Sequence, residues 1–240
     1  MPNTGYNRHF KWLKELNIPI PPLEIQNKIA KTLDTASELI SLRKKQLEEL
    51  DNLIKSIFYD MFGDPLTNEK GWQKKFWNDI FNTTTGKLDS NAACKNGKYP
   101  FFTCSKDMLR INEYAFDCEA LLLAGNNASA IYDVKYYNGK FNAYQRTYVI
   151  TLKSERDQYL FYKFLLEQKL TEMKQNSKGT NTKYLTLEIL RRLDFIVPPQ
   201  QLQTKFAEIV TKIEEKKALV QKAINESQYL FDSLMSKYFD

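Results

Sequence analysis

The sequence predicts an α+β protein in which a globular α/β domain is flanked by two long helices that pair as an antiparallel coiled coil. Three observations predict this class: a repeat that brackets the chain, heptad spacing of apolar residues in both copies of the repeat, and short apolar runs separated by turn signals between the copies. Hydrophobic residues make up 42% of the 240 positions. A chain of this length and composition can bury its own core.

The repeat begins each copy in the same way. Residues 16–62 align without a gap on residues 193–239, and each copy opens with a short apolar segment that ends in two prolines. A residue before proline avoids the helical conformation, whereas proline is tolerated in a first helical turn. Each copy therefore predicts an extended segment followed by a helix that begins near Pro22 or Pro199.

Apolar positions within both predicted helices alternate in steps of four and three residues, which is the spacing of a coiled-coil seam. Polar residues interrupt the seam at Arg43, Lys217 and Ser227, where they are expected to help set the register. The first seam comprises Ile29, Leu33, Ala36, Ile40, Arg43, Leu47, Leu50, Ile54, Ile57 and Met61. The second comprises Phe206, Val210, Ile213, Lys217, Val220, Ile224, Ser227, Phe231, Leu234 and Tyr238. Each helix needs a partner of similar length, and the other copy is the obvious one.

The segment between the copies is predicted to form a separate α/β domain over residues 64–194. Gly63 and Pro65 interrupt the first helix. The pair Asn138-Gly139 predicts a hairpin between the last two expected strands. The expected strands cover residues 76–83, 99–103, 120–124, 130–137 and 141–152.

The second half of this domain is predicted to be mainly helix and loop. A helix is expected over residues 156–175, followed by a polar loop over residues 176–183. A short helical turn over residues 185–193 then leads into the second proline pair. The polar loop suits phosphate contacts through lysine, threonine hydroxyl and free amides, although a plain surface loop would have the same composition.

Positive charge gathers outside the two long helices. The formal net charge is +6, of which +5 falls in residues 64–194 and +2 in residues 1–17, while residues 18–63 carry −1 and residues 195–240 carry 0. A basic middle segment is typical of a domain that binds a polyanion, but an ordinary solvated surface can carry the same excess.

Residues for catalysis and for cofactor binding are missing from the pattern. His9 is the only histidine, so a serine or cysteine nucleophile in the middle domain would have no local base. Cys94, Cys104 and Cys118 fit neither a disulfide framework nor a metal knuckle and are expected to be buried thiols. Phosphate-loop, dinucleotide and methyltransferase motifs are absent. The sequence therefore predicts no catalytic residue, no metal ligand and no cofactor.

Hydropathy argues against a membrane protein. No stretch approaches the roughly 20 consecutive apolar residues of a membrane helix, and the first residues lack the apolar core of a signal peptide. A cytoplasmic location without membrane contact is therefore expected.

Several motifs, taken in order, carry a likeness to a known family. They are the two proline pairs with Gln26 and Gln203, residues 57–65, Gly71-Trp72, Gly86-Lys87, residues 142–146, Gly179-Thr180 and Leu185-Thr186. Their order covers nearly the whole chain and resembles the specificity subunit of Type I restriction-modification systems. The resemblance implies a non-catalytic DNA-binding subunit whose recognition domains read the two halves of a split site. The long helices would set the distance between these domains.

The same resemblance implies the partners and the domain division. Methyltransferase subunits would bind alongside, carry the cofactor, and connect the chain to the restriction subunit. Residues 1–17 match residues 178–194 in position and are expected to be the remnant of a preceding recognition domain. Residues 18–63 and 195–240 would each hold a long helix, and residues 64–194 would be the target-recognition domain. Since only one such domain is whole, the chain is expected to be either a natural half-subunit or an N-terminally shortened piece of a longer subunit. A half-subunit could restore the missing half by pairing with a second copy through the helices as a homodimer.

DNA contacts are predicted from residue type and loop position. Base reading needs paired donors and acceptors, and phosphate binding needs cations and hydroxyls. The candidates for bases are Ser105, Asn126, Asn127, Gln145 and Arg146. The candidates for phosphates are Lys106, Arg110, Lys135, Lys140, Lys178, Thr180 and Lys183.

Two other functions fit parts of the pattern. A coiled-coil scaffold that binds only protein would leave the basic domain incidental. A fragment of a fused restriction-methylation enzyme would share the recognition domain, but would need methyltransferase motifs on the same chain. Titration with duplex DNA at two salt concentrations separates the scaffold from a DNA-binding subunit, because phosphate contacts weaken steeply with salt.

Overall fold

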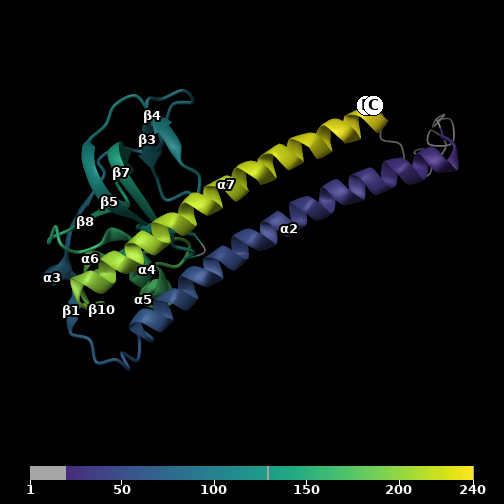
Figure 1. The fold of residues 1–240 in the computed structure, drawn as a ribbon. Helices are drawn as coiled ribbons and strands as arrows, with labels where there is room; N and C mark the ends of the chain where they lie inside the picture. Colours follow the sequence, from purple (N-terminus) through teal and green to yellow (C-terminus); the bar gives the residue numbers. More distant parts are fainter. Residues whose placement is uncertain (1–19, 129, 240) are drawn as a thin grey trace. The chain divides into compact units, whose positions relative to one another are not determined.

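The structure is a computed structural model that describes residues 20–128 and 130–239 (Figure 1). The described chain divides into two compact units. We call residues 20–49 with 217–239 the helical unit, and residues 50–216 the globular unit. The expected remnant at residues 1–17 lies outside the described residues. No helix of the described part is long and apolar enough to cross a membrane.

The two long helices begin where the prolines predict. Helix α2 (Leu23–Phe62) and helix α7 (Gln200–Phe239) are each 40 residues long and start directly after Pro22 and Pro199. Every predicted seam position in both helices is buried or half-buried, which confirms the heptad spacing. Helix α2 ends before Gly63, whose φ of +71° lies in the left-handed region that favours glycine.

The repeated sequence forms the same cap at the start of both helices. The Gln26 side-chain amide donates to the Pro21 carbonyl at 2.8 Å, and the Gln203 amide donates to the Pro198 carbonyl at 2.9 Å. These bonds occupy carbonyls just before the first turn. The repeat therefore encodes a local structure as well as a pattern of apolar residues.

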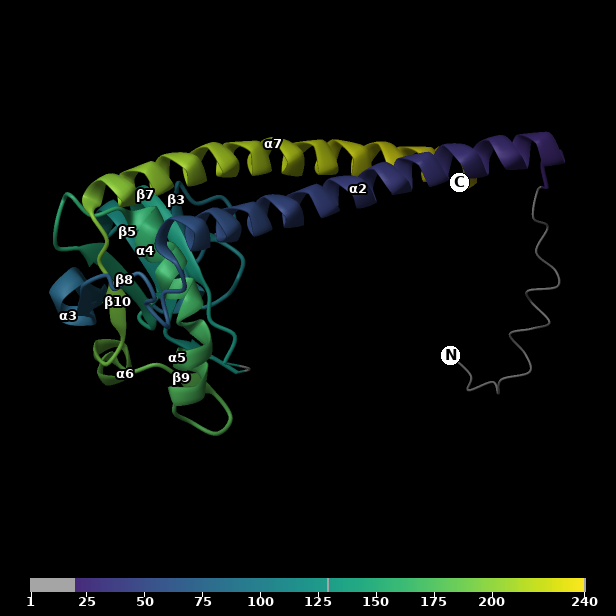
Figure 2. The same cartoon turned by 60° about the horizontal axis from the view of Figure 1, so that its bottom comes forward.

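In the helical unit, the segments of α2 and α7 run side by side in opposite directions (Figures 1 and 2). Ile40 and Ile224 are buried in this pair. The Arg43 guanidinium donates to the Ala223 carbonyl at 2.6 Å and to the Ser227 hydroxyl. Two of the predicted polar interruptions thus contact each other across the seam, as expected for residues that set the register.

A curled six-stranded sheet forms the centre of the globular unit, in the order β2-β8-β5-β7-β3-β4. All its neighbouring strands are antiparallel except β3 and β7. Along β5, Leu121 and Leu123 face the larger core, while Ala120 and Leu122 face a smaller one, which is the alternation of a strand buried on both faces. The strands are β1 (Lys74–Phe76), β2 (Phe81–Thr85), β3 (Tyr99–Phe102), β4 (Leu109–Ile111), β5 (Phe116–Ala124), β6 (Asn126–Asn127), β7 (Val134–Ala143), β8 (Thr147–Leu152), β9 (Lys183–Tyr184) and β10 (Asp194–Ile196).

An aromatic cluster joins the ends of both long helices to the core of the globular unit. Phe58 lies 4.2 Å from Phe164 and 5.4 Å from Phe206, measured between ring centroids. Phe62 and Phe161 complete the cluster at 4.9 Å from each other. The shorter helices are α3 (Trp77–Ile80), α4 (Tyr159–Gln168), α5 (Leu170–Asn176) and α6 (Leu187–Arg191), with a 3-10 turn at Ser90–Ala92.

Three strand predictions are wrong. The strand expected over residues 141–152 is divided, because β7 ends at Ala143 and β8 begins at Thr147. The strand expected over residues 76–83 is divided by helix α3, because the Asp79 carboxylate accepts a hydrogen bond from the Phe76 amide and starts a helical turn. The hairpin expected at Asn138-Gly139 does not form, since β7 continues through both residues and Gly139 pairs with Cys118 on β5. Gly139 adopts a φ of +130°, which glycine tolerates, so the strand continues through this residue without a turn.

Two further predictions need correction. The helix expected over residues 156–175 is two helices that meet at Lys169, which has a φ of −84° and a ψ of −4°. The three cysteines carry free thiols but are half-buried rather than buried.

A partly buried ion-pair network lies where β10 meets β1. The Asp194 carboxylate lies 3.0 Å from the Lys74 ammonium and 3.1 Å from the Lys169 ammonium, which also lies 3.1 Å from Glu172. Burial raises the pKa of the Asp194 carboxyl, but the hydrogen bonds from Lys74 and Lys169 outweigh it, so the pKa lies below its ordinary value. The ionised carboxylate therefore stabilises the folded state.

Substituting the aromatic cluster should destabilise the protein strongly. Phe58→Ala removes a fully buried ring, and we expect the free energy of unfolding to fall by about 3–5 kcal/mol. The neighbouring Tyr59 is 42% exposed, so Tyr59→Ala should cost less than about 1 kcal/mol. Chemical denaturation followed by circular dichroism measures both values. Equal losses for the two variants would contradict the placement of the Phe58 ring.

The Asp194 network should make stability depend on acid pH. A carboxyl with a lowered folded pKa contributes stability above its unfolded pKa of about 3.9 and loses it as the pH falls through the folded value. Asp194→Asn should therefore be less stable than the wild type at pH 7, and its unfolding free energy should decline less below about pH 4. Urea denaturation across this range tests the expectation, with Asp60→Asn as an exposed control. Parallel pH profiles for wild type and Asp194→Asn would rule it out.

Candidate nucleic-acid interface

A turn at residues 144–146, here called the clamped turn, joins the ends of several strands. The Tyr144 amide donates to the Phe102 carbonyl at the end of β3, and the Gln145 amide donates to the Leu88 carbonyl beyond β2, both at 2.9 Å. Leu88 and Tyr144 also form a parallel bridge. Since β2 lies at an edge of the sheet, this bridge shows that the sheet curls back upon itself.

The carbonyl of Arg146 holds the other side of the clamped turn. It accepts a hydrogen bond from the Gly125 amide at 2.8 Å and from the Cys104 thiol at 3.4 Å. Glycine permits this close approach: a Cβ on Gly125 would lie 2.4 Å from the Arg146 oxygen, and a Cβ on Gly86 would lie 1.7 Å from the Ala143 oxygen. Neither position can take a larger residue without moving the backbone.

Two short strands bring the polar loop at residues 176–183 close to the clamped turn. Asn126 pairs with Tyr184 and Asn127 pairs with Lys183 in an antiparallel ribbon of β6 and β9. The Gly125 carbonyl accepts a hydrogen bond from the Leu185 amide at 2.8 Å. Candidates that lie about 57 residues apart in the sequence are thus neighbours in the structure.

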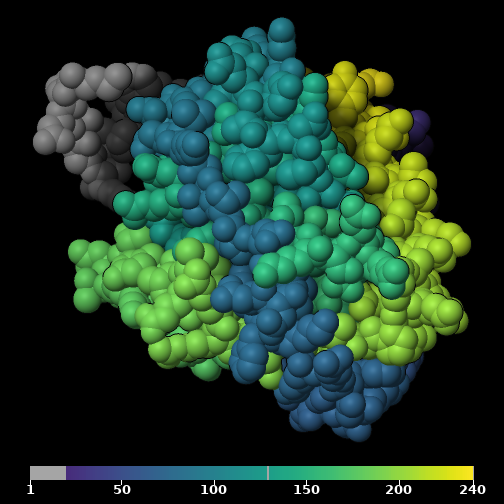
Figure 3. Space-filling view, turned by 90° about the vertical axis from the view of Figure 1, so that its left-hand side faces the viewer, coloured from purple at the N-terminus to yellow at the C-terminus, as the bar shows by residue number. Residues whose placement is uncertain are grey.

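Together, residues 86–89, 103–106, 125–127, 144–146 and 177–185 form what we call the loop cluster. Hydrogen bonds of the main chain and of the Cys104 thiol link these five segments. Figure 3 shows how segments coloured blue, teal and lime, which lie far apart in the sequence, come together on one face of the globular unit. The predicted DNA contacts that belong to the loop cluster are Ser105, Lys106, Asn126, Asn127, Gln145, Arg146, Lys178, Thr180 and Lys183.

Several cations of the loop cluster are available to a ligand. Lys106 and Arg146 are exposed, and their side chains form no hydrogen bond or ion pair with the described residues. Lys183 is half-buried. Lys178 lies 3.7 Å from Glu188, but both side chains are largely exposed, so this pair is weak. Lys87 is a further exposed cation here that was not among the candidates, although the Gly86-Lys87 motif marked its position.

The remaining three candidates are engaged within the protein. Arg110 donates to the carbonyls of Gly97 at 2.9 Å and Lys98 at 2.8 Å. Lys135 donates to the Ser105 carbonyl at 2.5 Å and lies 3.1 Å from Asp133, so it holds the segment at residues 103–106.

Lys140 is held at the start of β5. Its ammonium lies 3.9 Å from Asp117 and 4.7 Å from the centre of the Tyr114 ring. Tyr114 and then Asp117 raise the pKa of the Lys140 ammonium. Among the described contacts, neither Lys140 nor Arg110 touches the loop cluster. Their proposed phosphate contacts remain predictions.

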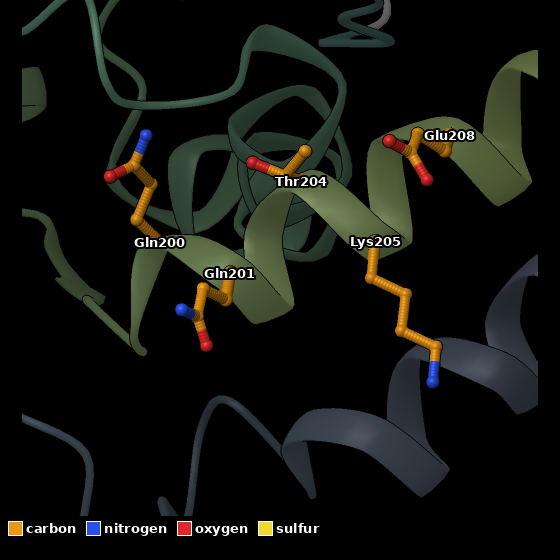
Figure 4. Close-up of a pocket in the computed structure, with 5 residues that line it drawn as sticks. All are labelled: Gln200, Gln201, Thr204, Lys205 and Glu208. Carbon is orange, nitrogen blue, oxygen red and sulfur yellow. The ribbon is translucent and has the colours of Figure 1, made fainter.

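A polar hollow of about 330 Å³ lies at the first turns of α7. It is lined by Gln200, Gln201, Thr204, Lys205 and Glu208. Figure 4 shows Gln201 and Lys205 pointing to one side of the helix, while Gln200 and Thr204 point to the other. A small-molecule site needs polar groups that converge on the ligand, so this hollow does not fit one.

Comparison with known proteins points to one family. The sequence pattern described as Type I restriction modification DNA specificity domain matches residues 4–52 and 69–227. The chain is 36% identical over 151 residues to the Type I restriction enzyme EcoDI specificity subunit of Escherichia coli, covering 61% of this chain and 33% of that protein. It is 30% identical over 263 residues to the MjaIX specificity subunit of Methanocaldococcus jannaschii, covering 94% and 60%. The chain thus spans between a third and three fifths of these relatives.

The fold agrees with a solved structure. The crystal structure of a Type-I restriction-modification system S subunit from M. genitalium superposes with a TM-score of 0.69 at 19% identity, over 91% of this chain and 61% of that one. At this identity the likeness shows the fold alone. Together with the sequence pattern, it confirms the resemblance inferred from the motifs. The chain therefore belongs to the family of Type I restriction-modification DNA specificity domains.

Proposed function

We propose that this chain is a sequence-specific DNA-binding subunit that directs the methyltransferase and restriction subunits of a Type I complex to a split target site. The loop cluster is the observation that supports this most directly. Its linked segments carry the exposed, unpaired cations Lys106 and Arg146 together with the amide-bearing residues Asn126 and Gln145. Cations suit phosphates, while amides and guanidinium groups suit the edges of bases.

The candidate residues divide into two roles under this proposal. Lys106, Lys178 and Lys183, with the Thr180 hydroxyl, would bind phosphates and set the position of the duplex. Ser105, Asn126, Asn127, Gln145 and Arg146 would face the bases. Lys135 would act indirectly, because it already holds the Ser105 carbonyl.

The domain division follows the same proposal. Residues 64–194 would be the target-recognition domain, and residues 18–63 and 195–240 would each supply one long helix. The matching caps at Gln26 and Gln203 support the view that the two helix-bearing segments are equivalent parts. Two copies of the chain would then pair about a two-fold axis and read the two halves of a symmetric split site.

The chemistry would belong to the partners. Methyltransferase subunits would carry the cofactor and the reaction centre, and this chain would act in the cytoplasm by binding and positioning. Its contribution to specificity is a difference in affinity between the target and other sequences, which needs base contacts in addition to phosphate contacts.

DNA binding should depend steeply on salt. We expect the full chain to bind a randomised duplex pool more weakly as salt is raised from about 50 to 200 mM, because counterions are released from the phosphates. Lys106→Gln should reduce the slope of log Kd against log salt by about 1. Lys44→Gln removes the same charge from an exposed position on helix α2, outside the loop cluster, so the slope should stay unchanged. Binding that is indifferent to salt would favour the protein scaffold, and equal slopes for the two variants would refute this interface.

Assembly can be tested by mass. Analytical ultracentrifugation of the chain, whose monomer mass is 28.2 kDa, should show a dimer that dissociates on dilution. Addition of a purified methyltransferase subunit of the same system should produce a heavier complex. A mass of one monomer at all concentrations would exclude two-fold pairing, whereas an unchanged sedimentation profile after the addition would exclude the proposed partner.

A further inference from the structure

The clamped turn presents two adjacent side chains on a backbone that cannot easily move. Gln145 and Arg146 are both exposed. The amide of Gln145 and the carbonyl of Arg146 are bonded to residues of other segments, and the Tyr144 carbonyl accepts a hydrogen bond from the Thr147 amide at 2.8 Å. A side chain that reads a base needs such a fixed origin, because a shift of about 1 Å loses paired hydrogen bonds.

The Arg146 guanidinium is free while its own backbone is fixed. It forms no hydrogen bond or ion pair with the described residues, so its donors are available. The acidic side chain beside the turn, Asp89, accepts hydrogen bonds from Gln145 at 3.4 Å and from the Asn91 amide at 3.2 Å.

Arg110 is the informative contrast within the same unit. Its guanidinium is committed to two main-chain carbonyls, those of Gly97 and Lys98. These bonds hold the loop before β3 against β4 and leave the guanidinium a structural group. Arg146 has the opposite arrangement, with an anchored main chain and an unengaged side chain. This arrangement fits recognition of a ligand from outside the protein.

We propose that Arg146 is a specificity-determining residue that reads a guanine in the major groove, donating two hydrogen bonds to its N7 and O6 atoms. The planar fork of arginine matches two neighbouring acceptors, which guanine presents in this groove, whereas adenine presents one acceptor beside a donor. The inference rests on the proposed DNA-binding function and names the base that one residue of the loop cluster selects. Gln145, held toward Asp89, lies beside it in the turn.

The test compares two variants that each lose one positive charge. The full chain, Arg146→Gln and Lys106→Gln are each used to select from a randomised duplex pool, and the enriched motifs are compared. Arg146→Gln should lose the preference for a G·C pair at one position and bind the wild-type motif about 10-fold or more weakly. Lys106→Gln should select the wild-type motif with uniformly weaker binding.

A second variant distinguishes recognition of guanine from an effect of positive charge and from an effect on folding. Arg146→Lys keeps the charge but lacks the planar fork, so the guanine preference should weaken while the salt dependence stays that of the wild type. Thermal melting of both Arg146 variants should match the wild type, since the side chain is exposed and forms no hydrogen bond or ion pair with a described residue. An unchanged motif in either folded variant would overturn the inference and leave DNA binding intact. Failure of the wild type to enrich any motif would instead overturn the proposed function, and this inference with it.

Discussion

Burial of five phenylalanine rings at the junction of α2, α4 and α7 is the interaction on which the globular unit depends. Phe58 and Phe62 come from the end of one long helix, Phe206 comes from the start of the other, and Phe161 and Phe164 lie between them on α4. Because neighbouring rings pack with their centroids 4.2 to 6.3 Å apart, the points where the chain enters and leaves the domain are held together. Helix α4 in turn packs on β5 and β7, so the same cluster supports the sheet.

The loop cluster depends on a second constraint, which is the close approach of main chains. Gly86 and Gly125 let the end of β7 and the clamped turn come within distances that a Cβ atom would forbid. The result is a turn whose polar backbone groups are bonded to the ends of β3 and β5 and to the segment after β2. Rigidity at this position is what a recognition surface needs, because fewer groups must be ordered when the ligand binds.

Charged residues of the globular unit fall into two groups that look alike in the sequence. Lys135, Lys169 and Arg110 bond to carbonyls or carboxylates of the protein and hold segments in place. Lys106 and Arg146 have exposed side chains without a described partner. The net charge of the segment is therefore a poor guide to its binding surface. Whether each cation is bonded to a group of the protein is a better guide.

The sequence by itself determined the two long helices, their proline-led starts, their seams and the family, because these features are local and periodic or depend on the order of motifs. The strands at residues 99–103 and 120–124 were also predictable as short apolar runs. The hairpin signal at Asn138-Gly139 failed because pairing of β7 with β5 outweighs a local turn preference.

Only the tertiary structure decided which candidates form one surface. Asn127 pairs with Lys183 in two strands of two residues each, which no local sequence pattern predicts. The Arg110 guanidinium is committed because another segment contributes two carbonyls to it, whereas the Arg146 guanidinium meets no such acceptor among the described residues. Such contacts arise when the curled sheet closes, and residue type alone carries no information about them.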